Sequence, residues 1–340
     1  MITIYILHAG LSHPSPYFYN FCKELDKIKE FNYVINPELP DYEPNGNGII
    51  YFNRLKRFYK SDDEITANEF LNKIDDLKNK GWKIVWTIHN FFPIDRSVTK
   101  VDEYIVEEFI KKCDLVFTLT DYMKKSIMNQ YNIEAINHGM GFNELDGIFD
   151  KKVVKYHKYR EFTFTFVGNI YKYKLLDKII ESFNKLTDAK LIIAGKEPSN
   201  SNVNIKEKIK NNKNIIYIDE FVGKTDWDTL SKMTDSFINI YDLYTPAFKF
   251  GFFPSNFINI YYYGNRCISP NHEIIKELIP SSQIILYDFK DEDGLFKAME
   301  SVKEKGKIKS NKNDEAKKVY NWNKTIKIFT SNCKKLFNGS

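Results

Sequence analysis

In this 340-residue chain, glycines and the polar side chains of lysine and asparagine follow an apolar strand, where a phosphate could be bound. Residues 162–174 read FTFTFVGNIYKYK, an apolar strand that ends at Gly168 and Asn169 and is followed by Lys172 and Lys174, just before an amphipathic run. A glycine turn and two ammonium groups beside a helix N-terminus form a cradle for a diphosphate. A phosphate-bearing ligand is the first prediction.

Further residues of this kind follow other strands of the same half. Gly195 ends the run KLIIAG, and Glu220 and Phe221 follow NIIYI. Ser255 and Asn256 open the helical segment NFINIYYYG, where exposed backbone amides can hold a pyrophosphate. An ordinary helix N-cap would also select Ser and Asn, so position alone does not separate the two interpretations.

Two histidines end strands in the first half. His89 and Asn90 end KIVWTIHN, and His138 and Gly139 end EAINHG. An imidazole at the carboxyl end of a strand can donate to a phosphate or a sugar hydroxyl. We therefore expect His89 to be functional, with a buried histidine bonded to a backbone carbonyl as the alternative. Gly139 would permit close approach of a ligand, or form a plain turn, and Asp95 is a candidate general base.

The loop HAGLSHPSPYF follows the first strand. Its glycine permits a tight turn and its two prolines stiffen it. His13, Ser15 and Tyr17 of this loop are expected to face a cleft between domains. For His13 a solvated loop histidine is the alternative.

These residues need a scaffold of parallel strands, and apolar runs alternate with helix-length segments throughout the chain. That alternation predicts an α/β fold with two Rossmann-like, doubly wound parallel-sheet domains facing a cleft. The polar run 151–161 is the best linker. It gives an N-terminal domain over 1–150 and a C-terminal domain over 151–316. Residues 317–340 are predicted to form a helix that packs back across the N-terminal domain.

Charge is unevenly distributed along the chain. Residues 1–150 carry 17 basic and 23 acidic side chains, and the remainder carries 33 and 22. A basic C-terminal half suits a phosphate-bearing ligand or contact with an anionic membrane surface. A solvated lysine-rich surface is the alternative. No nucleic-acid-binding motif is recognisable, so nucleic acid is not expected as a partner.

The absence of several sequence motifs argues against further classes of protein. The four cysteines lie far apart, and no long apolar segment is present. We expect a cytoplasmic protein without disulfides. No Walker lysine loop, zinc signature, nucleophile elbow or G-x-G-x-x-G fingerprint occurs, which argues against ATPases, metallohydrolases, esterases and dehydrogenases. No metal or other cofactor is expected.

The order of the segments resembles a bacterial glycosyltransferase of the GT-B fold, most similar to the retaining family 4 group of capsule and exopolysaccharide type. Each motif is short and degenerate, but their shared order over about 250 residues is informative. The matching pieces are WTIHNFFP, CDLVFTLTDYMKKSI, INHGM, FVGNIYKYKLLDKIIESF, KLIIAGK, NIIYIDEFV, DWDTLSKMTDSFINIYD and FFPSNFINIYYYGNRCISPN.

The resemblance implies transfer of a hexose from a UDP- or GDP-linked sugar to a saccharide or lipid-linked saccharide in surface polysaccharide synthesis. Within it, Lys174 would neutralise the donor diphosphate and His89 would contact the donor sugar or phosphate. The implied nucleotide-sugar site comprises Gly168, Asn169, Lys172, Lys174, Gly195, Glu220, Phe221, Ser255, Asn256, Asn259, His138 and Gly139. The implied acceptor site comprises His13, Ser15, Tyr17 and Asn90.

Two departures from the family pattern leave alternatives open. Where the family has an arginine in the glycine turn, this chain has Asn169 and Tyr171, and the nearby ammonium of Lys172 cannot reproduce a bidentate guanidinium. The family's paired glutamates fall at Gly251 and Asn259. Ribose contact and retention are therefore open, and inversion would need Asp95 or His13 as the base. A non-catalytic scaffold subunit and a UDP-sugar epimerase of the same fold are the alternatives.

Overall fold

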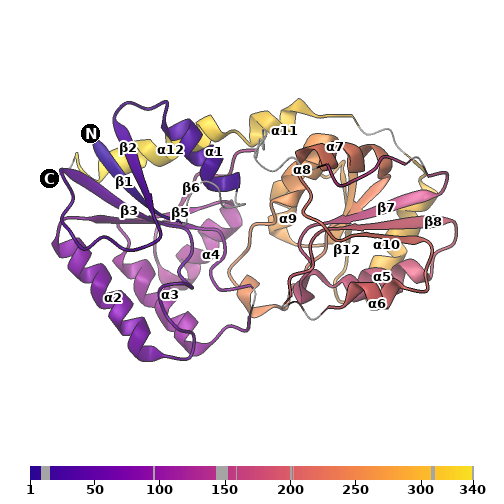
Figure 1. Ribbon diagram of the computed structural model, residues 1–340, viewed down its shortest axis with the longest axis horizontal. Coiled ribbons are helices and arrows are strands. Elements are labelled where there is room, and N and C mark those ends of the chain that lie inside the picture. The colour runs from indigo at the N-terminus through magenta and orange to yellow at the C-terminus, as the bar shows by residue number, and fades with distance from the viewer. Residues whose placement is uncertain are drawn as a thin grey trace. The chain divides into compact units, whose positions relative to one another are not determined.

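The computed structural model describes residues 1–8, 16–94, 96–142, 152–157, 159–199, 201, 203–307 and 311–338. The chain forms two compact units. The first comprises Met1–Asn143, Pro246–Phe253 and Tyr320–Ser340, and the second comprises Glu144–Thr245 and Pro254–Val319. Each unit has its own parallel sheet with helices on both faces (Figure 1).

The first unit contains the strands β1 (Ile2–Leu7), β2 (Phe31–Asn36), β3 (Asn47–Phe52), β4 (Lys83–Ile88), β5 (Leu115–Thr118) and β6 (Ile136–Asn137), and the helices α1 (Pro16–Leu25), α2 (Glu64–Asn79), α3 (Lys100–Lys112) and α4 (Asp121–Tyr131). The sheet order is β2-β1-β3-β4-β5-β6. Because the order turns back at β1, right-handed crossovers place α1 on one face and α2 and α3 on the other (Figure 1). The ends of β1 and β3 border the switch point where such sheets bind ligands.

The last helix, α12 (Trp322–Lys335), belongs to the first unit and packs beside α1 (Figure 1). The ring of Phe329 meets those of Phe21 and Tyr51 edge-on, with centroids 5.0 and 5.2 Å away. The helix thus contributes to the aromatic core of this unit. It begins later than predicted, because residues 314–319 form a separate helix, α11, in the second unit.

An aromatic segment, Pro246–Phe253, also belongs to the first unit, although the chain on either side of it lies in the second. The Phe250 ring packs against Phe91 and Tyr131, with centroids 5.4 and 5.7 Å away. Phe252 forms an isolated antiparallel bridge with Asn90. Burial of these aromatic rings divides the run FKFGFFPSN, residues 248–256, between the two units.

The second unit contains the strands β7 (Phe162–Val167), β8 (Ala189–Ala194), β9 (Ile215–Ile218), β10 (Ser236–Ile238), β11 (Arg266–Pro270) and β12 (Ile284–Tyr287), and the helices α5 (Leu176–Asn184), α6 (Ile205–Ile209), α7 (Lys224–Met233), α8 (Asn256–Tyr263), α9 (Glu273–Leu278) and α10 (Gly294–Glu304). The sheet order is β12-β11-β10-β7-β8-β9. The switch point therefore lies between β7 and β10. Helix α10 was not predicted from the sequence, although its residues Leu295, Ala298, Met299 and Val302 have helical spacing and are buried.

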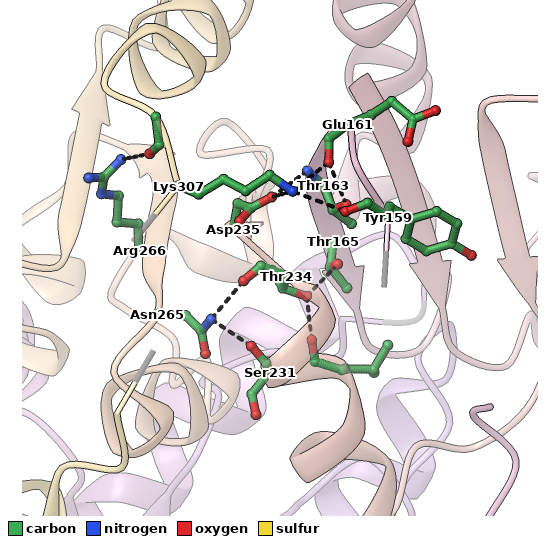
Figure 2. Close-up of polar contacts among 12 residues, drawn as sticks. Tyr159, Glu161, Thr163, Thr165, Ser231, Thr234, Asp235, Asn265, Arg266 and Lys307 are labelled. Carbon is green, nitrogen blue, oxygen red and sulfur yellow. Dashed lines mark hydrogen bonds and ion pairs between the residues drawn. The ribbon is translucent and has the colours of Figure 1, made fainter. Parts of the chain in front are cut away.

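A polar cluster anchors the amino ends of the strands in the second unit (Figure 2). Asp235, just before β10, accepts a hydrogen bond from the backbone N–H of Thr163 at 2.8 Å. Lys307 lies 3.2 Å from the same carboxylate and donates to the carbonyl of Glu161. Asn265 donates to the carbonyls of Ser231 and Thr234. Ligands bind at the opposite, carboxyl edge, so this cluster stabilises the fold.

Replacing Asp235 with Ala is expected to lower the free energy of unfolding by about 2–4 kcal/mol, because it leaves the buried N–H of Thr163 without its acceptor and Lys307 without its carboxylate partner. The midpoint of urea unfolding measures the loss. Asp293→Ala is the matched control, since it removes only an ion pair to Lys185 that is exposed to solvent and contributes little to stability. Equal midpoints for the two variants would contradict a structural role for the cluster.

Candidate functional site

The glycines that end β7 and β8 lie against each other in the second unit. Gly168 and Gly195 have φ values of 133° and 155°. A Cβ at Gly195 would lie 2.0 Å from the carbonyl oxygen of Gly168, so no side chain fits there. The Asn256 side chain donates to the carbonyl of Val167 at 2.7 Å. The structure therefore brings three predicted residues together at one edge of the sheet.

Lys174 is a buried cation at the switch point of this sheet. It ends the 3₁₀ turn η1 (Lys172–Lys174) after β7, and only 7% of the residue is exposed. Its Nζ lies 3.8 Å from the centroid of the Tyr241 ring, which follows β10. The backbone N–H of Asp242 donates to the carbonyl of Tyr173 at 2.8 Å and ties the two loops together. Among the described residues no carboxylate pairs with this ammonium group.

Burial lowers the pKa of Lys174 to about 7. The apolar surroundings disfavour the charged form, and the face of Tyr241 offsets only part of that cost. A bound anion would supply the missing countercharge and restore the ordinary, fully protonated ammonium. The geometry thus favours a phosphate ligand over a structural role for this lysine.

The side chain of Lys172 does not lie beside that of Lys174. A 3₁₀ helix has three residues per turn, so two residues that are two positions apart lie on different faces of it. Lys172 is exposed and lines a cavity of about 670 Å³ beside α5, together with Asp177, Ser182 and Lys208. The structure therefore does not bring the two ammonium groups together, and among the described residues Lys174 is the buried one after β7.

A buried hydrogen-bonded chain crosses the carboxyl edge of the first unit's sheet. The hydroxyl of Tyr17 lies 2.8 Å from that of Tyr51, which donates to Thr87 at 2.8 Å. Thr87 Oγ1 lies 3.0 Å from His138 Nε2, and His138 Nδ1 lies 2.6 Å from the carbonyl of Gly139. Burial lowers the pKa of His138 to about 4. These hydrogen bonds hold the edge together and occupy both ring nitrogens of His138. The ligand contacts predicted for His138 and Tyr17 stay predictions.

His89 lies next to these hydrogen-bonded residues, but its own ring is bonded differently. Its ring meets that of Tyr17 edge-on at a centroid distance of 4.4 Å. Its Nε2 is buried and has no hydrogen bond among the described residues. Burial, with smaller contributions from the charges of Arg54 and His138, lowers the pKa of His89 to about 3. The imidazole is neutral at physiological pH and has an unused polar atom, which agrees with the predicted functional role.

The loops after β3 and β4 form a small pocket in the first unit. Its cavity volume is about 100 Å³, and its lining includes Asn53, Arg54, Tyr59 and the predicted acceptor residue Asn90. Asn53 and Arg54 were not predicted from the sequence. They follow the apolar run NGIIYF, and residues just beyond the carboxyl end of a parallel strand are candidates for ligand binding.

Comparison with known proteins now decides the family. Residues 149–319, which cover the second unit and slightly more than half of the chain, match the family model of glycosyl transferases group 1. The chain belongs to this family. A relative described as an uncharacterized glycosyltransferase, MJ1069 of Methanocaldococcus jannaschii, is 23% identical over 92% of this chain and 86% of its own length.

Solved structures show the same GT-B architecture as this glycosyltransferase. Sucrose-phosphate synthase from Thermosynechococcus elongatus aligns over the full length of both chains, with a TM-score of 0.72 and 10% identity. Anabaena HepE in complex with UDP and glucose aligns over 98% of this chain and all of its own, with a TM-score of 0.64 and 9% identity. The α/β fold with two Rossmann-like domains is confirmed.

Other predicted donor residues of the glycosyltransferase are spread along the carboxyl edge of the second unit. Glu220 is exposed and Phe221 is 42% exposed, both after β9. Ser255 precedes α8 without a side-chain cap. Asn169 follows the turn at Gly168 and is exposed, and Asn259 is half-buried on α8. The first α8 amides with hydrogen bonds are those of residues 257 and 258, which leaves the two preceding amides outside the helix ladder.

Three further predictions fall on His13, Ser15 and Asp95, which lie outside the described residues. Gly139 has a φ of 67°, and no described residue lies within 4 Å of where its Cβ would be. The close approach of a ligand predicted for this position stays a prediction.

The glycosyltransferase contains two Asp-x-Asp sequences, at residues 226–228 and 291–293. Asp226 is buried and accepts hydrogen bonds from the amides of Val153 and Val154, which anchors the segment after the predicted domain boundary. Asp291 pairs with Lys297 at 2.8 Å. Within the described ranges, no three His, Cys, Asp or Glu residues are grouped so that they could hold a metal ion. Nor does any described helix combine the length and apolarity needed to cross a bilayer.

Proposed function

We propose that this glycosyltransferase moves a hexose from a UDP- or GDP-linked sugar to a hydroxyl of a saccharide or lipid-linked saccharide in surface polysaccharide synthesis. The observation that carries the proposal is Lys174, a buried ammonium without a carboxylate partner in the described chain, at the switch point of the second unit. A nucleoside diphosphate supplies the charge that this position lacks. The neighbours solved with UDP, such as HepE, support a nucleotide-sugar donor.

In the proposed reaction, Lys174 and the amides at the start of α8 stabilise the negative charge that develops on the leaving diphosphate. No metal is assigned to that task. An acceptor hydroxyl attacks the anomeric carbon from the face that the diphosphate leaves, and a leaving phosphate oxygen takes the hydroxyl proton. The configuration is then retained. His89, neutral at physiological pH, forms a hydrogen bond with a sugar hydroxyl.

A panel of UDP- and GDP-linked sugars tests the proposal. We expect one donor class to release nucleoside diphosphate in the presence of saccharide acceptors, at an unchanged rate in EDTA. NMR of the product should show a new glycosidic bond with the donor's anomeric configuration. A free epimerised sugar would identify the epimerase, and absence of nucleotide binding would identify the scaffold protein. Loss of activity in EDTA would refute the metal-independent mechanism.

Peripheral contact with the inner face of the cell membrane is part of the proposal for a lipid-linked acceptor. Its support is the basic C-terminal half of the sequence. The pair Lys334-Lys335 contributes less positive charge to membrane contact than the sequence indicates, because Lys334 forms an ion pair with Glu30 at 2.7 Å.

A further inference from the structure

The pocket after β3 and β4 is cationic on one side. Arg54 lines it, with the side chains of Asn53 and Asn90 and the apolar side chain of Phe92. No acidic side chain belongs to the described part of its lining. A volume of about 100 Å³ is small beside the roughly 300–1,000 Å³ of drug-sized ligand sites, so one chemical group fits there and a nucleotide does not.

The carboxylate of Asp102, which contacts the pocket residue Tyr59, is already neutralised. Tyr59, which lines the pocket, donates to Asp102 at 2.5 Å, and Arg96 forms two hydrogen bonds to the same carboxylate at 2.6 and 2.7 Å. Burial opposes ionisation of Asp102, but these hydrogen bonds hold its pKa below the ordinary value. Asp102 is therefore a stable partner of Arg96, and no described carboxylate pairs with Arg54.

Arg54 and Arg57 belong to the same loop but have different surroundings. Arg57 packs its guanidinium 4.6 Å from the centroid of the Phe58 ring and donates to the carbonyl of Pro37 at 2.6 Å. Arg54 is exposed, and it makes no hydrogen bond or ion pair with any described residue. Its charge is nevertheless close enough to His89 to lower the pKa of that imidazole. An anion bound at Arg54 would therefore lie near the proposed sugar-binding histidine.

We propose that this pocket binds one acidic group, a carboxylate or a phosphate, carried by the acceptor sugar. Arg54 forms a bidentate pair with the group, and the amides of Asn53 and Asn90 supply further donors. That the bound sugar is the acceptor rests on the proposed function, whereas the preference of the pocket for an anion rests on its lining residues alone. The enzyme would then extend an acidic saccharide or a sugar phosphate, and discriminate against neutral sugars.

Calorimetry with three small probes tests the proposal: methyl β-glucuronide, glucose 6-phosphate and neutral methyl β-glucoside. The titrations use the full-length Lys174→Met variant, so that phosphate binding at the second unit does not contribute. We expect one or both anionic sugars to bind and the glucoside to bind at least ~10-fold more weakly, the loss of about one charged hydrogen bond. The tighter anion shows whether the group is a carboxylate or a phosphate.

Adding Arg54→Met should weaken binding of the anionic probe ~10-fold or more, whereas Arg57→Met should leave it within about twofold. Binding of neither anion, equal binding of the glucoside, or equal effects of the two substitutions would overturn the proposal. UDP and GDP titrated into the otherwise unchanged protein report on the donor site. Failure of the acceptor pocket can therefore be told from failure of the proposed function.

Discussion

The Lys174→Met variant is expected to bind UDP or GDP about 30- to 1,000-fold more weakly than the unchanged protein and to unfold at a higher temperature. The first effect follows because one member of a buried charge pair is removed, which costs roughly 2–4 kcal/mol. The second follows because a buried ammonium with no carboxylate partner among the described residues destabilises the empty protein. A methionine fills similar space without that cost.

The pH dependence of the unchanged protein should show the same linkage. The unfolded chain keeps this lysine protonated to about pH 10.5, whereas in the folded protein it loses its proton near pH 7. Folding therefore releases a proton between these values, and stability rises with pH across this window. Nucleotide affinity should change in the opposite direction and fall as pH rises above about 7, because the diphosphate needs the ammonium form.

Calorimetric titrations and thermal unfolding measure both quantities. Lys178→Met is the matched control, since Lys178 is also in this segment but packs against the Phe289 ring. The control should change neither nucleotide affinity nor its pH dependence. Unchanged affinity in Lys174→Met, or equal losses in both variants, would refute the donor site.

Much of this architecture could be predicted from local sequence. The strands β1, β4, β7 and β8 are rich in apolar residues and mostly buried, as expected where both faces of a parallel sheet are covered. The glycines after β7 and β8 were selected correctly, because few residues other than glycine tolerate the backbone conformation after each of these strands. In such cases the structure depends on residues that are close together in the sequence, so a segment of a few residues is enough to predict it.

What could not be predicted depends on tertiary packing. Nothing in the run PAFKFGFF states that its rings pack against Phe91 and Tyr131 rather than within the second unit. Tyr241 was missed for the same reason, since its role is set by a lysine 67 positions earlier in the chain. The sequence also could not show how the surroundings of the two histidines differ. Sequence places His89 and His138 alike at strand ends, and only the hydrogen bonds of their ring nitrogens separate them.

Acid should destabilise the first unit through these two histidines. In the unfolded chain both imidazoles take up protons near pH 6.5, whereas in the folded protein burial keeps His138 neutral to about pH 4 and His89 to about pH 3. The unfolded state therefore binds more protons below pH 6.5. The free energy of unfolding should fall as pH decreases from about 6.5 to 4.

The His89→Ala variant should lose ~100-fold or more in turnover while keeping its fold. The expected loss corresponds to one preorganised hydrogen bond to the reacting sugar. The fold should survive because no described residue uses Nε2, so its removal leaves no buried partner unpaired. Since the imidazole stays neutral above about pH 3, His89 should add no inflection to the turnover profile between pH 5 and 9.

His138→Ala is the matched control on the same sheet edge, and it should behave in the opposite way. Its removal leaves Thr87 Oγ1 and the carbonyl of Gly139 without their ring partners, and a cavity opens beside Phe329. We expect a loss of about 2–4 kcal/mol in the free energy of unfolding. Steady-state turnover and urea unfolding of both variants separate the two roles. Turnover unchanged in His89→Ala, or an inflection near pH 6.5 that this substitution abolishes, would show that the imidazole does not act as a neutral hydrogen-bonding group.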